Sequence, residues 1–306
     1  MTQQRFRRNR AIGLSLIAAL AMLLQPSGRA EAAAQSEAFP PFRIAGNLYY
    51  VGVKGTAEYL ISTPQGLILI NADWDKNVPL IRASVEKLGF KFSDIKILLV
   101  SHAHIDHVEG GAAIKAATHA SYMVMEQDVD VVESGGKTDF NHGLGLPEEQ
   151  LFPAAKVDRV LHDGDKVSLG GTELVAHLTP GHTKGCTTWT MKVQDGGKSY
   201  DVVIVGSAAV GPKVDMLHNP RYPRQVEDYE QMFKVLKTLP ADIFLGAHGG
   251  YFDMEKKYAQ LQQKGSTNPF VDPAGYKEYV AKSESEFRTV LAKQRAAQAA
   301  AGQPAR

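Results

Sequence analysis

Short apolar runs alternate with polar turns in the first part of the chain. The turns contain Gly, Pro and Lys residues, which is typical of β-strands joined by tight turns. The runs occupy residues 47–53, 57–63 and 66–71. Residues 77–88 differ, because their apolar side chains recur every three or four positions and Gly89 follows where a helix would end. The pattern predicts a meander of strands followed by a helix.

Strand and helix patterns continue to alternate along the rest of the chain. Continuous β-branched and leucine runs predict buried strands, and amphipathic stretches predict helices. We expect strands at 97–100, 121–125, 157–161, 166–169, 173–179, 187–193, 202–205 and 243–245. We expect helices at 109–119, 226–239, 253–264 and 275–292.

These elements form two similar successions, over roughly residues 40–150 and 155–250. Two β-sheets packed face to face, with helices outside, would accommodate both successions. No linker rich in Pro, Gly or Ser separates them, so residues 35–306 are expected to fold as a single domain. The last segment, 294–306, is low in complexity and is expected to be disordered.

The N-terminus has the composition of a secretory signal peptide. A basic head with four arginines precedes an apolar run at 11–24, and alanines follow at 30 and 32–34. This order is typical of an export signal, and the apolar run is short for a membrane span. We expect residues 1–34 to be removed and the mature chain to act in a bacterial periplasm, without membrane association.

Composition narrows the class of protein further. Of the 306 residues, 44% are hydrophobic and 22% are charged, which excludes a disordered chain. Lys and Arg number 34 and Asp and Glu 33, so the net charge of +1 gives no reason to expect nucleic-acid binding. A single cysteine excludes an intrachain disulfide and a cysteine-rich zinc site, which directs attention to the ten histidines.

Ligand-type side chains are concentrated directly after the predicted strand at 97–100. The following segment reads Ser-His-Ala-His-Ile-Asp-His. His102 and His104 are two residues apart, so an extended chain projects both to one side. Asp106 and His107 follow where the chain turns into the next helix. Because Zn²⁺ accepts neutral imidazole and carboxylate as ligands, the segment predicts a zinc site.

Two further histidines follow other predicted strands. His182 lies in a Thr-Pro-Gly-His turn and His248 in a Gly-Ala-His-Gly-Gly turn, where glycine lets the backbone come close. With the first cluster they supply six ligands, enough for two metals with three protein ligands each. Three ligands and an open position form the catalytic rather than the structural zinc arrangement. The other histidines are expected to be ordinary surface or core residues: His119, His142, His162, His177 and His218.

The chain resembles a known enzyme family at these motifs. His-Ala-His-Ile-Asp-His resembles the HxHxDH signature of the metallo-β-lactamase superfamily. Thr179–Trp189 (TPGHTKGCTTW) and Asn219–Pro223 (NPRYP) are similar to the subclass B3 metallo-β-lactamases. The similarity covers roughly residues 40–290. It implies an α/β fold, an αββα sandwich of two mixed β-sheets with helices on the outer faces and metals at one edge between the sheets.

The resemblance also implies how the ligands divide between two Zn²⁺ ions. His102, His104 and His182 would hold the first ion. Asp106, His107 and His248 would hold the second. A hydroxide or water bridging the two ions would attack the substrate carbonyl, with Asp106 orienting it.

Such a positively charged pocket favours an anionic substrate, and β-lactams carry a carboxylate beside the ring nitrogen. The resemblance therefore implies a zinc-dependent β-lactamase that hydrolyses the amide bond of penicillins, cephalosporins and carbapenems. We expect this enzyme to act as a monomer on small molecules.

One segment departs from a pattern common in the superfamily. Residues 202–212 contain no acid, where many of its hydrolases place an aspartate that bridges both metals. This absence argues against the alternative, another dizinc hydrolase of the same fold that acts on a lactone, ester or thioester. A zinc-binding protein without catalysis is a third possibility. Ser207 is a candidate catalytic or substrate-binding residue, and Lys213 is a second candidate for the substrate carboxylate.

Three other expectations concern the surroundings of the site. Asp73, at the end of a predicted strand, is a candidate partner for a ligating histidine. Cys186 is expected to be a buried apolar residue. A glycine-rich loop at 135–147 is a candidate cover for the substrate, through Phe140, Leu144 and Leu146.

Overall fold

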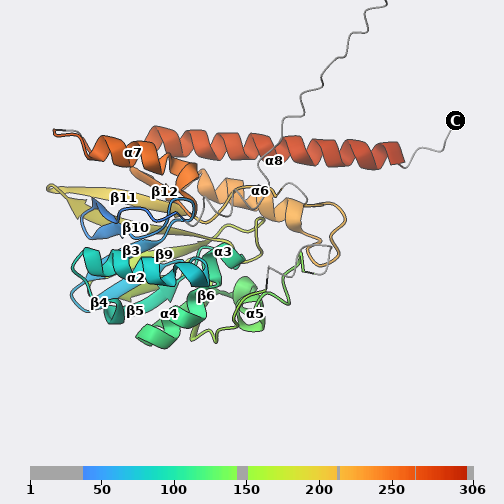
Figure 1. The fold of residues 1–306 in the computed structure, drawn as a ribbon. Coiled ribbons are helices and arrows are strands. Elements are labelled where there is room, and N and C mark those ends of the chain that lie inside the picture. Colours follow the sequence, from blue (N-terminus) through green and yellow to red (C-terminus); the bar gives the residue numbers. More distant parts are fainter. Residues whose placement is uncertain (1–36, 143–150, 212–213, 266, 302–306) are drawn as a thin grey trace, which may run out of the picture.

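Two β-sheets lie against each other, with helices on their outer sides (Figure 1). The computed structural model describes residues 37–142, 151–211, 214–265 and 267–301. The first sheet has the spatial order β1 (Phe42–Ala45), β2 (Leu48–Tyr50), β3 (Tyr59–Thr63), β4 (Gly66–Ile70), β5 (Ile95–Leu99), β6 (Ser121–Met125), β7 (Arg159–Leu161). The second sheet has the order β12 (Ile243–Gly246), β11 (Lys198–Val205), β10 (Thr187–Asp195), β9 (Thr172–Leu178), β8 (Lys166–Leu169). The predicted αββα sandwich is confirmed.

The helices form the two outer layers. On the side of the first sheet lie α2 (Val78–Lys87), α4 (Gly111–Thr118) and α5 (Glu126–Ser134), with the short α3 (Ile105–Val108) at the sheet edge (Figure 1). On the side of the second sheet lie α6 (Gln225–Leu236), α7 (Met254–Leu261) and the long α8 (Pro273–Ala301). Short 3-10 turns are η1 (Asp75–Asn77), η2 (Phe92–Asp94) and η4 (Gly249–Phe252). Among the described residues, no helix combines the length and the apolar character needed to cross a membrane.

Side-chain alternation along the strands builds the layers. On β4, Ile68 and Ile70 enter the core between the sheets, where Trp189 of β10 is also buried. Leu67 and Leu69 point the other way and join the core beneath α2 and α4. Apolar side chains on both faces explain why the sequence of β4 is a continuous apolar run rather than an alternating one.

Strand direction decides where the loops open. β4 and β5 are parallel neighbours in the first sheet, and β11 and β12 are parallel neighbours in the second. β9 and β11 are both antiparallel to β10, so they run in the same direction. Parallel strands end at the same edge of their sheet. The loops that follow these strands are therefore brought to one edge of each sheet.

Several expectations differ from the structure. Residues 159–161 belong to the first sheet as β7, although they begin the second succession along the chain. Strand β1 and helix α5 have no counterpart among the expected elements. Residues 294–301, which were expected to be disordered, instead continue α8, because they consist of Ala, Gln and Arg, all good helix formers. Residues 302–306 and the expected signal peptide at 1–34 lie outside the described residues.

Candidate metal centre

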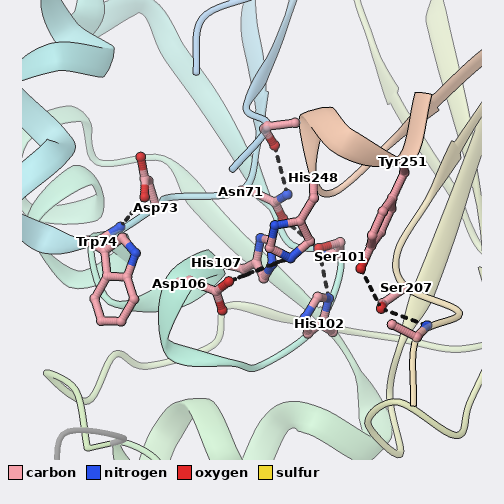
Figure 2. A network of polar contacts seen from close by, with 12 residues as sticks. Asn71, Asp73, Trp74, Ser101, His102, Asp106, His107, Ser207, His248 and Tyr251 are labelled. Atoms are coloured by element: carbon pink, nitrogen blue, oxygen red, sulfur yellow. Dashed lines mark hydrogen bonds and ion pairs between the residues drawn. The ribbon is translucent and has the colours of Figure 1, made fainter. Parts of the chain in front are cut away.

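Three loops bring the expected ligands together at one edge of the sandwich. The loop after β5 carries His102, His104, Asp106 and His107. His182 follows β9 and His248 follows β12 in the second sheet. The site therefore spans both sheets, and Figure 2 shows His248 from the second sheet beside His107 from the first.

One group of ligands consists of three imidazoles. His102, His104 and His182 each offer a ring nitrogen, and these atoms lie within 4.8 Å of one another. The three rings meet nearly at right angles, with centroids 4.6 to 4.9 Å apart. The Nδ1 of His182 lies 2.8 Å from the carbonyl oxygen of Ala209, to which it donates, so its Nε2 is free for a ligand.

A second group contains the carboxylate. Asp106 Oδ2 lies 3.4 Å from His107 Nε2 and 3.6 Å from His248 Nε2. The two Nε2 atoms of His107 and His248 are 3.2 Å apart. His102 also lies within 4.8 Å of Asp106 and His107, so it stands between the two groups. Both three-residue sets expected from the sequence are thus brought together.

Local structure holds the first loop in place. His104 has extended backbone angles and precedes the short helix α3, which places Asp106 and His107 in its single turn. Asn71, after β4, accepts a hydrogen bond from Ser101 N at 2.8 Å and donates one to Ala57 O at 3.0 Å (Figure 2). The loop after β5 is therefore anchored to the neighbouring strand before the ligands begin.

The electrostatics of the cluster favour the metal-binding protonation states. Burial lowers the pKa of His102, and the neighbouring His107 and His182 lower it further. Burial lowers the pKa of His107 to about 3, although Asp106 opposes the shift. Burial alone would raise the pKa of Asp106, but His107 and His248 hold it at about 2. Neutral imidazoles and an ionised carboxylate are the forms that bind zinc.

The chemistry of the donor set fits bound zinc. His102 Nε2 is buried and has no hydrogen-bond partner among the described residues, which is unfavourable unless a ligand occupies the position. The Nε2 atoms of His107 and His248 both lie near Asp106 Oδ2, and the pKa of each imidazole is lowered. A bound cation would give all three atoms a partner. Nitrogen and oxygen donors without sulfur match one of the usual zinc ligand sets.

Ser207 lies at the same edge, after β11, but it is fully buried. Its Oγ lies 3.0 Å from Tyr251 Oη and accepts a hydrogen bond from Ala209 N at 3.3 Å. Because Ser207 is buried and its hydroxyl is already hydrogen-bonded, the structure shows no direct access for a substrate, and the role of Ser207 stays a prediction. Lys213 lies outside the described residues.

Asp73 is buried, but it makes no hydrogen bond to a candidate metal ligand in the described structure. It accepts hydrogen bonds from Trp74 N at 2.7 Å and Asn77 Nδ2 at 3.1 Å. Burial raises its pKa to about 7, against the opposing effect of these bonds. In the described structure Asp73 therefore stabilises the turn after β4 rather than orienting a histidine directly.

Other expectations near the site can also be compared with the structure. Cys186 is fully buried, as expected, and burial raises the pKa of its thiol to about 12. Phe140 packs in the interior against Tyr222, with ring centroids 4.9 Å apart, so it does not cover a substrate. Leu144 and Leu146 lie outside the described residues.

Within the described chain, the other five histidines join neither ligand group. Three of them have partners elsewhere: His177 lies 2.8 Å from Thr190 Oγ1, His162 lies 3.5 Å from Glu126, and His218 lies 3.0 Å from Asp215.

Three residues of the site were not expected from the sequence: Asn71, Asp128 and Tyr251. Asn71 ends the strand expected at 66–71, and nothing in that pattern indicates its hydrogen bond to Ser101 N. Asp128 lies on α5, which the sequence pattern did not predict, and its acidic neighbours are typical of a solvated helix start. Tyr251 follows His248 by three residues, and nothing in that spacing indicates its contact with Ser207.

Comparison with known proteins identifies the class. Residues 52–248 match the family described as the Metallo-beta-lactamase superfamily, and the chain belongs to this superfamily. The native FEZ-1 metallo-beta-lactamase from Legionella gormanii is 56% identical, with a TM-score of 0.82 over 85% of this chain and 98% of that chain. The class B3 di-zinc metallo-beta-lactamase LRA-12 from an Alaskan soil metagenome is 35% identical, with a TM-score of 0.78 over 84% of this chain and 96% of that one.

A curated relative has a different name. A hydroxyacylglutathione hydrolase from Rhodopseudomonas palustris is 33% identical over 125 residues, which are 41% of this chain. The match spans only 39% of that relative's length. That similarity is thus limited to part of each chain, whereas the similarity over most of both chains is to metallo-β-lactamases of subclass B3.

Proposed function

We propose that this protein is a dizinc β-lactamase that hydrolyses the amide bond of penicillins, cephalosporins and carbapenems. The observation that carries the proposal is the pair of three-ligand groups at one edge of the sandwich. The loop after β11 agrees with it, because this loop contains Ser207 and no acidic residue that could bridge two metals. Similarity to class B3 enzymes over most of the chain supports it.

Two bound zinc ions would polarise a substrate carbonyl and lower the pKa of a water molecule to near neutrality. His102, His104 and His182 would hold one ion, and Asp106, His107 and His248 the other. The protein's contribution is orientation, since Ala209 O fixes the tautomer of His182 and Ser101 Oγ lies 3.2 Å from His102 Nδ1. Asp106 brings one negative charge, which leaves a loaded site positive and suited to the carboxylate of a β-lactam.

Hydrolysis of a thioester is the second candidate, because the curated relative is a hydroxyacylglutathione hydrolase. Against it stands the segment 202–212, which has no acid to bridge two metals. A lactone or ester substrate meets the same objection. We therefore place these reactions behind β-lactam hydrolysis.

The test is hydrolysis of a penicillin, a cephalosporin and a carbapenem by residues 35–306, with and without chelator and added zinc. We expect turnover that chelator abolishes and zinc restores, and that Asp106→Asn reduces strongly. A thioester, a lactone and an ester are run in parallel. Turnover of one of these with all three β-lactams left intact would refute the proposal in favour of the second candidate, and zinc binding without any turnover would indicate a non-catalytic protein.

We also propose that the protein is exported and acts in the periplasm as a monomer. The basic, apolar and small-residue order of positions 1–34 supports export. Fractionation of bacteria that express the full chain should find it in the periplasm, beginning near residue 33 or 35. A cytoplasmic product that retains residue 1 would contradict export. Sedimentation of the mature protein should give a mass close to that of one chain.

A further inference from the structure

A buried carboxylate outside the ligand set lies close to the three-histidine group. Asp128, on α5, is 2% exposed. Its Oδ2 accepts hydrogen bonds from Ala103 N at 2.9 Å and from Thr183 Oγ1 at 2.8 Å. Its Oδ1 accepts one from Gly185 N at 2.8 Å. Both oxygens are thus satisfied by short hydrogen bonds in the interior.

These bonds reach the two loops that carry the three histidines. Ala103 lies between His102 and His104, in the loop that follows β5 of the first sheet. Thr183 directly follows His182, in the loop that follows β9 of the second sheet. One carboxylate therefore connects loops from opposite sheets at the point where their ligands must converge.

The second loop is shaped to approach this carboxylate. A Cβ at Gly185 would lie 2.7 Å from both Cβ and Cγ of Asp128, closer than carbon atoms can pack. Only glycine permits the Gly185 amide to reach Oδ1 here. The close approach shows that the loop and the helix fit each other rather than merely lying near.

Charge supports the same role. The three histidines are neutral ligands, so they do not balance the charge of a bound cation. Two of the three groups that bond to Asp128 are backbone amides, which can only donate, and this favours the ionised carboxylate as their acceptor. A carboxylate bonded to the ligand loops would supply negative charge near the first ion without occupying a coordination position.

We propose that Asp128 is a positioning residue for the three-histidine metal group. It holds the His102–His104 loop and the His182 loop at the spacing at which one ion contacts all three imidazoles. The inference rests on the metal site of the proposed function but not on the identity of the substrate.

The test measures zinc binding directly. Zinc-loaded protein is titrated with a competing chromophoric chelator, in the parent and in a His248→Ala background that leaves only the three-histidine group complete. Asp128→Asn replaces an acceptor with an amide that faces donors, and we expect zinc affinity at this group to fall 10- to 100-fold, roughly the usual effect of losing such a partner. In the cobalt-substituted protein, the same variant should change the visible absorption of the bound ion.

Glu133→Gln is the matched control. Glu133 lies on the same helix, and its Oε1 accepts a hydrogen bond from Val157 N at 2.9 Å, away from both ligand loops. Like Asp128→Asn, the Glu133→Gln substitution removes one negative charge from α5 and replaces a carboxylate that accepts a hydrogen bond from a backbone amide. It should leave zinc affinity and the cobalt spectrum unchanged. Equal losses in Asp128→Asn and Glu133→Gln would overturn the proposal, because the effect would then be general to α5.

Thr183 provides a second test if Asp128→Asn does not fold. Thr183→Val removes one hydrogen bond to Asp128 and should weaken zinc binding several-fold, while Thr183→Ser keeps the hydroxyl and should restore it. Equal affinities in these two variants would also overturn the proposal. These measurements use no β-lactam, so weakened zinc binding in a protein that hydrolyses no β-lactam would refute only the proposed function. Unchanged zinc binding in an active β-lactamase would refute only the role of Asp128.

Discussion

The hydroxyl oxygen of Ser207 lies 3.0 Å from that of Tyr251 (Figure 2). Tyr251 belongs to η4, directly after the loop that carries His248, and its ring meets the imidazole of His248 with centroids 5.1 Å apart. Ser207 follows β11 in the neighbouring loop. The contact therefore connects two loops of the second sheet behind the carboxylate-containing metal group.

Tyr251→Phe tests this connection. Phenylalanine keeps the ring beside His248 but removes the hydroxyl, so we expect the free energy of unfolding to fall by about 1 kcal/mol, the usual net value of such a bond. Zinc affinity should change little. Ser207→Ala should cost somewhat more in urea unfolding, because it also removes the hydrogen bond from Ala209 N. If the hydrogen bond between Ser207 and Tyr251 is the cause, the free energy of unfolding should fall less in the double variant than the sum of the two single-variant losses. Losses that add fully would contradict this explanation.

His248→Ala should remove the second zinc ion selectively. The variant leaves His102, His104 and His182 intact, so one ion should still bind while the other weakens strongly. Chelator titration of the zinc-loaded protein should then show one tight ion instead of two. His177→Ala is the control, because His177 bonds to Thr190 outside the ligand groups. Equal weakening of both ions would contradict the division of ligands.

Gln294 anchors a loop beyond the ligands. Its Oε1 accepts a hydrogen bond from Met216 N at 3.1 Å, and its Nε2 donates to Val214 O at 2.7 Å. Gln294→Ala should lower the free energy of unfolding by about 1–2 kcal/mol, because two hydrogen bonds are lost, and should speed proteolysis within residues 214–217. Gln298→Ala, one turn further along α8 on an exposed position, should change neither. Identical proteolysis of the two variants would argue against an anchoring role.

Glu58 should make stability depend on pH. It is fully buried, and burial together with the charge of Asp73 raises its pKa well above its ordinary value of 4.5. Because the folded protein retains a proton that the unfolded chain releases, stability falls as pH rises from 4.5 toward the raised pKa. Glu58→Gln has no carboxyl group to ionise at this position and so avoids the loss of stability. The difference in free energy of unfolding between Glu58→Gln and the parent should therefore grow with pH, by up to about 1.4 kcal/mol per pH unit.

The measurement is urea unfolding of both proteins at saturating zinc between about pH 5 and 8.5, a range that begins just above the ordinary pKa of glutamate. The two proteins share the same metal ligands, so the difference between their curves reports Glu58. Glu86→Gln, on the exposed side of α2, is the control and should run parallel to the parent. If the free energies of unfolding of Glu58→Gln and the parent differ by the same amount at every pH in this range, Glu58 does not cause the pH dependence.

The strands and the ligands could largely be predicted from local patterns. Apolar runs such as 66–71 and 243–245 identify buried strands, since a strand covered on both faces needs apolar side chains throughout. His182 and His248 each follow such a strand within a glycine-containing turn, so their position at a sheet edge follows from local order. Helix α5 and strand β1 were missed because α5 begins with acidic residues and β1 has only four residues.

The sequence by itself determined which side chains are available to bind metal and that they lie at strand ends, because chain spacing and hydrophobic periodicity are local properties. Only the tertiary structure decided that β7 belongs to the first sheet, that Tyr251 lies against Ser207, and that Asp128 connects the two ligand loops. These contacts join segments far apart along the chain. They depend on strand pairing and on the exclusion of water from buried polar groups, which no short stretch of sequence specifies.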